Sequence, residues 1–291
     1  MEIKFFRNKI FLTLINFIVA VWTVIYLFNL FNSKMLVVKI EHIRLLYWVL
    51  VIVILMMPIN LALETQKWRI AMNKLNMSFL SSFFIVISSI PYGIITPWRI
   101  GEWWGRIRNM SEQGKSFLIS SLTGFAQQII TISFGIISLL FLGFNGQKKI
   151  LIISLCILVI LFFIIYLVLE KRNKWFEYEK RKETVLVNLL FLSLVRYLVF
   201  ATQFVLLLRV FVLDISILNL YSAVAISYLV SFLLPLNSFI ELTLRSSVLI
   251  FILGSNIGVI YATVLIWIIN IMFPGIVGSV LLILENFKAK Y

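Results

Sequence analysis

Two glutamate–arginine pairs in this sequence have the residue types and the spacing to bind a charged group. Arg106 follows Glu102 by four residues, and Arg245 follows Glu241 by four residues. Side chains four residues apart share one face of an α-helix, so each pair presents a cation beside a carboxylate. Arginine binds phosphate through two parallel N–H donors and stays charged when water is removed. A glutamate suits an ammonium group or a sugar hydroxyl.

Two further arginines suit an anionic group. Arg99 lies three residues before Glu102, and Arg196 lies well inside the long apolar run 185–213. An arginine at such depth either serves a polar cavity or extends its side chain to the membrane surface. The Glu102–Arg106 pair also has a plainer interpretation, as an interfacial ion pair that contributes little. The candidate substrate-binding residues are Arg99, Glu102, Arg106, Arg196, Glu241 and Arg245.

Catalytic and metal-binding chemistry finds little support in the residue types. The chain has one histidine (His42), one aspartate (Asp214) and one cysteine (Cys156). A Ser-His-Asp triad or a transition-metal site is improbable with so few of these residues, and a single thiol permits no internal disulfide. No nucleotide-binding loop is visible. We therefore expect neither an enzyme nor a bound cofactor or metal.

The elements that must position these charges are membrane-spanning. Of the 291 residues, 62% are hydrophobic and 13% are charged, and the mean hydropathy is +1.06. Soluble domains carry about 25% charged residues, so this chain predicts an α-helical polytopic protein of a bacterial inner membrane. The formal net charge of +14 fits basic cytoplasmic loops facing anionic lipid rather than nucleic acid.

The apolar runs predict a single transmembrane domain, 1–291, with about seven to eight transmembrane helices. The first run, 10–31, is too long for the core of a signal peptide and lacks a small-residue cleavage site, so we expect a retained span. Lysine and arginine place the N-terminus and the basic segments 66–77 and 170–183 in the cytoplasm. The remaining runs are 45–63, 79–95, 117–144, 150–169, 185–213, 219–236 and 248–284, the last with expected breaks near 254–258 and at 274–275.

The segment 79–115 has to begin and end on the cytoplasmic side if 117–144 leaves the cytoplasm and 150–169 returns to it. It is interrupted by Pro91, Gly93 and Pro97, which favours a re-entrant hairpin. Broken backbone at membrane depth is tolerated only where protein or a water-filled cavity surrounds it. The alternative is one plain span followed by an amphipathic helix at the interface.

The two halves of the chain echo each other. Pro97 and Pro235 each end an apolar run, and each precedes a glutamate and then an arginine four residues later. Proline ends one helix and can begin the next, so each half predicts a broken helix that presents a charged pair. We expect a first repeat at about 45–169, a second at about 185–285, and a basic cytoplasmic linker at 170–184. Three crossings between the motifs would make the repeats inverted.

Other polar and aromatic residues lie near these motifs. The tryptophans are interpreted as interfacial anchors or as the lining of a headgroup cavity. Amides inside apolar runs usually form hydrogen bonds between helices. These residues are Trp98, Trp103 and Trp104, and Gln127, Gln128 and Asn270.

The motifs together resemble the lysylphosphatidylglycerol synthase transmembrane-region family, which is the lipid flippase part of a bacterial resistance factor and includes stand-alone membrane proteins. The matching segments are Leu63 to Arg69, Ile90 to Arg106 with its Pro-x-Arg-x-Gly-Glu core, Leu234-Pro235 with Glu241, and Pro274 to Gly278. Where the family tends to carry further arginines, this chain has Gln127-Gln128 and Trp267. The aminoacyltransferase domain of the full-length synthase is absent from this sequence.

The resemblance implies a flippase that moves a phospholipid or a lipid-linked headgroup across the membrane. The alternative is a non-transporting membrane subunit that anchors or regulates an enzyme of envelope lipid or glycan synthesis. The basic loop 170–183 would then be its docking surface.

Overall fold

In the computed structural model, the residues that are described are 43–72, 77–108, 110, 113–141, 182–254 and 257–288. They form helices, and no strand occurs within these ranges. Four of the helical stretches are long and apolar enough to cross a membrane: Arg44–Ala71, Ser116–Phe141, Val185–Phe211 and Ile257–Glu285. The chain is therefore an α-helical membrane protein. The predicted spans 10–31 and 150–169 lie outside the described residues, as does most of the predicted linker 170–184.

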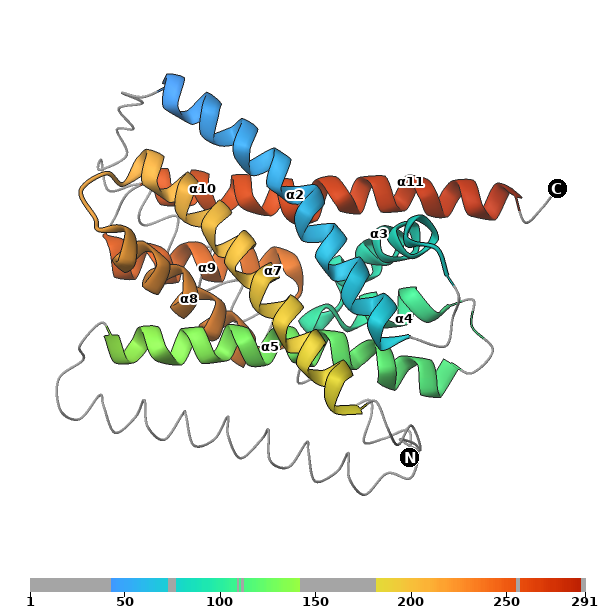
Figure 1. Ribbon diagram of the computed structural model, residues 1–291. Coiled ribbons are helices and arrows are strands. Elements are labelled where there is room, and N and C mark those ends of the chain that lie inside the picture. Colours follow the sequence, from blue (N-terminus) through green and yellow to red (C-terminus); the bar gives the residue numbers. More distant parts are fainter. Residues whose placement is uncertain are drawn as a thin grey trace, which may run out of the picture.

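Two long helices pack against each other and run antiparallel. They are α2 (Ile43–Ala71) and α7 (Lys182–Phe211). Near one end, the side-chain amide of Gln203 donates to the carbonyl of Val53, and near the other Arg196 pairs with Glu64. Higher residue numbers on α2 thus meet lower numbers on α7, as the colours in Figure 1 also show.

The first broken helix follows α2. It consists of α3 (Phe79–Ile95), a 3₁₀ turn η1 (Pro97–Arg99) and the short α4 (Ile100–Ile107). Ser78 caps α3 by accepting the N–H of Ser81 at 3.1 Å, which satisfies one free donor of the first turn. Thr96 is extended (φ −101°, ψ 143°), because the residue before a proline is pushed out of the helical region. The chain then turns back, so that α4 packs against α3.

The second broken helix repeats this design. It consists of α8 (Ile217–Leu233) and α9 (Ser238–Leu253). Leu234, which precedes Pro235, is extended (φ −112°, ψ 136°), and Asn237 caps α9 by accepting the N–H of Ile240 at 3.1 Å. α8 is buried along an unbroken stretch from Ser222 to Leu229, as a helix in the centre of a bundle must be.

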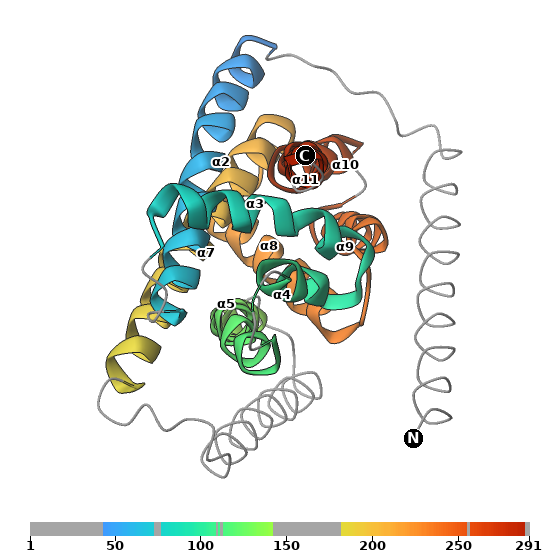
Figure 2. The same cartoon turned by 90° about the vertical axis from the view of Figure 1, so that its right-hand side faces the viewer.

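The remaining helices flank these two hairpins, each of which consists of the two parts of one broken helix. α5 (Gln113–Phe141) packs on α8. The last helical stretch consists of α10 (Ile257–Trp267), the π-helical turn η3 (Ile268–Met272) and α11 (Phe273–Lys288). Its α11 part packs on α3. Figure 2 shows α5 and α11 end-on at opposite sides, with α4 and α8 between them. The largest apolar core joins α2, α7, α8 and α10 through residues such as Val53, Phe204, Leu208, Val224 and Val259.

Two sequence predictions about boundaries are wrong. The run expected to end at 63 continues as helix α2 to Ala71, so the basic segment 66–77 begins inside this helix. The predicted break at Pro274-Gly275 is also absent: η3 leads directly into α11, and the whole stretch Ile257–Glu285 is one candidate span. Local π-helical adjustments let a membrane helix contain a proline, because they re-satisfy the backbone groups that the proline frees.

Candidate functional site

One cavity of about 190 Å³ lies where the two broken helices meet. About 10–15 Å³ of such volume holds one water molecule, so there is room for a small polar group. All six candidate residues from the sequence line it: Arg99, Glu102, Arg106, Arg196, Glu241 and Arg245. They come from η1, α4, α7 and α9, and so from both halves of the chain. Their role in binding stays a prediction.

The tips of the two hairpins touch at this cavity. The backbone N–H of Trp98 donates to the carbonyl of Leu236 at 3.1 Å, and the indole N–H of Trp98 donates to the carbonyl of Phe232 at 3.0 Å. Leu236 lies in the break between α8 and α9, and Phe232 lies in the last turn of α8. Trp98 and Leu236 both line the cavity, so contacts between the two tips form part of its wall.

The first tip has an unusual backbone. Trp98 (φ 50°, ψ 17°) and Arg99 (φ 57°, ψ 27°) are both left-handed. A residue with a side chain costs about 1–2 kcal/mol in this conformation, and such strain concentrates at functional sites. The turn is so tight that a Cβ at Gly101 would lie 2.7 Å from the hydroxyl oxygen of Thr96. The strained turn aims Arg99 into the cavity at the start of α4.

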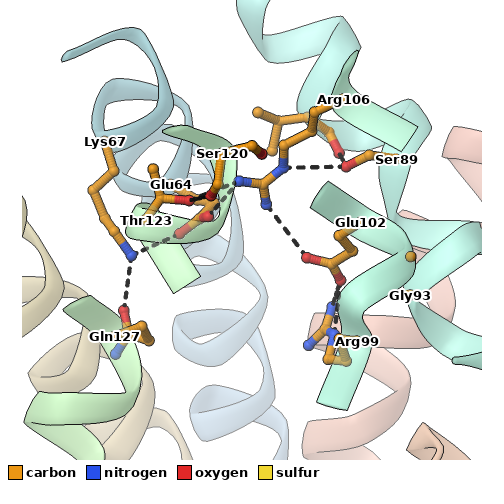
Figure 3. A network of polar contacts seen from close by, with 12 residues as sticks. Glu64, Lys67, Ser89, Gly93, Arg99, Glu102, Arg106, Ser120, Thr123 and Gln127 are labelled. Atoms are coloured by element: carbon orange, nitrogen blue, oxygen red, sulfur yellow. Dashed lines mark hydrogen bonds and ion pairs between the residues drawn. The ribbon is translucent and has the colours of Figure 1, made fainter. Parts of the chain in front are cut away.

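Glu64 is the centre of the charged network, and it comes from α2 (Figure 3). Its Oε1 accepts from Arg106 Nη1 at 2.8 Å, and its Oε2 accepts from Lys67 Nζ at 3.0 Å and Arg196 Nη1 at 2.9 Å. The Glu64 side chain is only 7% exposed and that of Lys67 is fully buried. One buried carboxylate therefore binds three cations from three helices.

Glu102 links this buried network to the first tip (Figure 3). Its Oε2 accepts from Arg106 Nη2 at 3.3 Å, and its Oε1 accepts from Arg99 Nε at 2.7 Å. Gly93 on α3 makes room for it, since a Cβ at Gly93 would lie 2.7 Å from Glu102 Oε1. The Arg106 side chain is only 2% exposed and that of Glu102 13%, so Glu102–Arg106 is a largely buried ion pair and not an exposed one.

Arg196 and the neighbouring amides connect α7 to this network. Arg196 donates through Nε to Asn60 Oδ1 at 2.8 Å and through Nη1 to Gln127 Oε1 at 3.4 Å. Asn270 in η3 donates to Gln203 Oε1 at 3.2 Å and accepts from Asn60 at 3.4 Å. The prediction that Gln127 and Asn270 form bonds between helices is confirmed. Arg196 points to the cavity instead of extending away from it.

The second pair, Glu241 and Arg245, occupies the other side of the cavity. The two side chains form an ion pair on α9. The Arg245 guanidinium also lies 3.8 Å from the centre of the Tyr228 ring, and its Nε donates to Ser231 at 3.4 Å. A cation over an aromatic face gains further stabilisation when water is excluded. Arg245 is thus held between α9 and the central helix α8.

The tryptophans of the first motif divide between two roles. Trp98 and Trp103 line the cavity, and Trp103 packs on α5 at Gly124. Trp104 is half exposed and packs against Phe117. Neither interpretation of these residues therefore holds for all three.

Sequence reasoning missed Glu64 and Lys67, two buried charges at the centre of the site. A signal was present, because a glutamate and a lysine three residues apart lie on one helical face and continue an apolar run. Within the described residues, no group of three or more His, Cys, Asp or Glu side chains could hold a metal ion. The site is therefore a network of arginines, one lysine and carboxylates.

Comparisons with known proteins leave the family resemblance as a prediction. A scan against protein-family models, a search of curated proteins and a search of solved structures each gave no match.

Proposed function

We propose that this protein moves a phospholipid or a lipid-linked molecule between the two leaflets of a bacterial inner membrane. The polar headgroup would enter the central cavity while the acyl chains stay in the surrounding lipid. The observation that carries the proposal is a charged cavity at the meeting point of two broken helices. Charged residues inside membrane segments usually mark a substrate pathway, and broken helices in two repeats are typical of transporter binding sites.

The packing of the helices supports an inverted repeat. Suppose that α2, α3, α4 and α5 correspond, in this order, to α7, α8, α9 and the α10–α11 stretch. The packing of α5 against α8 is then equivalent to the packing of α11 against α3. Corresponding helices of inverted repeats run in opposite directions, as α2 and α7 do. The second half would then be the first half turned over in the membrane.

The length of α4 supports a re-entrant hairpin. Its eight residues span about 12 Å at 1.5 Å per residue, whereas the hydrocarbon core is about 30 Å thick. A helix of that length cannot cross, so the segment after Pro97 would return toward the side from which α3 came. With the N-terminus in the cytoplasm, both hairpins would bring their tips to the middle of the membrane.

Alternating access is the mechanism that fits this arrangement. The headgroup would be reached from one leaflet at a time as the two repeats move relative to each other. Arg99, Arg196 and Arg245 would bind it. Movement down a concentration gradient is the minimal form of this transport.

The test is lipid translocation in proteoliposomes with the double variant Glu241→Ala/Arg245→Ala. We expect translocation of headgroup-labelled lipid to fall at least tenfold, because the second broken helix then contributes no charge to the cavity. The control is Arg108→Ala/Glu285→Ala, which removes an ion pair between α4 and α11 that does not line the cavity. Equal rates in wild type and the Glu241/Arg245 variant, at equal protein levels, would refute the site. If wild type moves no lipid, the alternative of a non-transporting subunit is favoured.

A further inference from the structure

The charges around the cavity do not balance. The cluster within the described residues contains five cationic side chains: Arg99, Arg106, Arg196, Arg245, and Lys67 behind them. It contains three carboxylates: Glu64, Glu102 and Glu241. The formal surplus is therefore two positive charges. Uncompensated charge inside a membrane protein is costly, so this surplus favours a ligand that supplies negative charge.

The cations form two layers. Arg106 and Lys67 are buried behind the cavity, with side-chain exposures of 2% and zero, and both bind Glu64. Arg99, Arg196 and Arg245 are more open, with exposures of 29%, 24% and 15%. Arg99, Arg196 and Arg245 all line the same cavity. Three guanidinium groups from both halves of the chain thus converge on one space.

The three carboxylates of the cluster already form ion pairs with its cations. Glu64 binds three cations, Glu102 binds Arg99 and Arg106, and Glu241 binds Arg245. An ammonium headgroup would have to compete with these arginines and would increase the positive surplus. An anionic group would instead use the open donors of the guanidinium groups.

We propose that the cavity selects a phosphate group with two negative charges, as in a lipid phosphomonoester or a pyrophosphate-linked lipid. This inference rests on the proposed function. The second pKa of a phosphomonoester is about 6, so this group carries close to two negative charges at pH 7 and matches the surplus. A phosphodiester carries one charge, and a zwitterionic headgroup has none in total. Three converging arginines also suit the several oxygens of a terminal phosphate.

The test compares three acyl-labelled lipids in proteoliposomes at pH 7: phosphatidic acid, phosphatidylglycerol and phosphatidylcholine. Each rate is corrected for protein-free vesicles. We expect phosphatidic acid to move at least tenfold faster than phosphatidylglycerol, and phosphatidylcholine to move least. Arg99→Gln reduces the surplus to one, so it should lower this preference at least fivefold, whereas Arg99→Lys should retain part of it. Arg44→Gln removes one charge from the exposed start of α2 and should leave the preference unchanged.

A second arm separates a lipid headgroup from the free ion. Release of entrapped radiolabelled phosphate and pyrophosphate is measured from the same vesicles, and we expect none above the protein-free rate. If the diester or the zwitterionic lipid moves as fast as phosphatidic acid, the selectivity is refuted and the proposed function stands. Passage of free phosphate without lipid movement would overturn both, since the protein would then transport the ion. Failure of every lipid and ion to move also overturns both.

Discussion

Glu64→Gln is expected to destabilise the folded protein strongly. The change leaves Arg106, Arg196 and Lys67 facing one another around a neutral amide in a buried site. Removing one partner of a buried ion pair costs about 3–5 kcal/mol, and here one carboxylate serves three cations. The measurement is the thermal unfolding midpoint of the purified protein in detergent, beside its yield from the membrane.

Two comparisons separate this effect from a general sensitivity to charge removal. The double variant Glu64→Gln/Lys67→Met also removes the fully buried cation, so it should recover part of the lost stability. Glu285→Gln removes a carboxylate whose side chain is 48% exposed, and surface ion pairs contribute about 0–1 kcal/mol. An unfolding midpoint for Glu64→Gln that equals the wild-type value would show that Glu64 does not hold the network together.

Cross-linking the two hairpin tips is expected to abolish headgroup translocation. Trp98 and Leu236 are joined by a backbone hydrogen bond of 3.1 Å and both line the cavity. A headgroup that passes between the repeats needs these tips to separate, and a covalent link would prevent that. The measurement uses Trp98→Cys/Leu236→Cys, in a background where Cys156 is replaced by serine, treated with a short bis-maleimide and assayed for lipid translocation.

The two single-cysteine variants, treated with the same reagent, are the controls and should keep most of their activity. A disulfide between the same positions, where it forms, should block translocation in the same way and release it on reduction. Full translocation by the cross-linked double variant would mean that the headgroup does not pass between the tips.

The breaks in the fold could be predicted because their cause is local. Pro97 and Pro235 force Thr96 and Leu234 out of the helical region, whatever the rest of the chain does. The i to i+4 pairs were likewise readable from spacing alone. All six predicted site residues line one cavity. No pattern in the sequence predicts the contact between the tips of the two hairpins, at Trp98 and Leu236.

The centre of the network could not be predicted in the same way. Glu64 meets Arg106 across 42 positions and Arg196 across 132 positions, and no local rule connects such residues. The sequence predicts a cytoplasmic position for Lys67, because lysines that follow an apolar run usually lie on the cytoplasmic side. Its burial depends on Glu64 three residues earlier and on Gln127 from α5. The continuity of the helical stretch from α10 into α11, which contains Pro274, includes a π-helical turn that composition does not reveal.

The central claim is that a lipid headgroup binds at the arginines that line the cavity, and the most direct test removes one of them. Lipid translocation in proteoliposomes is compared for wild type, Arg196→Gln and Arg209→Gln. Both variants remove one arginine from α7, but Arg196 lines the cavity, whereas Arg209 binds backbone carbonyls after the end of the helix. We predict at least a tenfold loss for Arg196→Gln and a near wild-type rate for Arg209→Gln. Equal rates in all three proteins would contradict the claim.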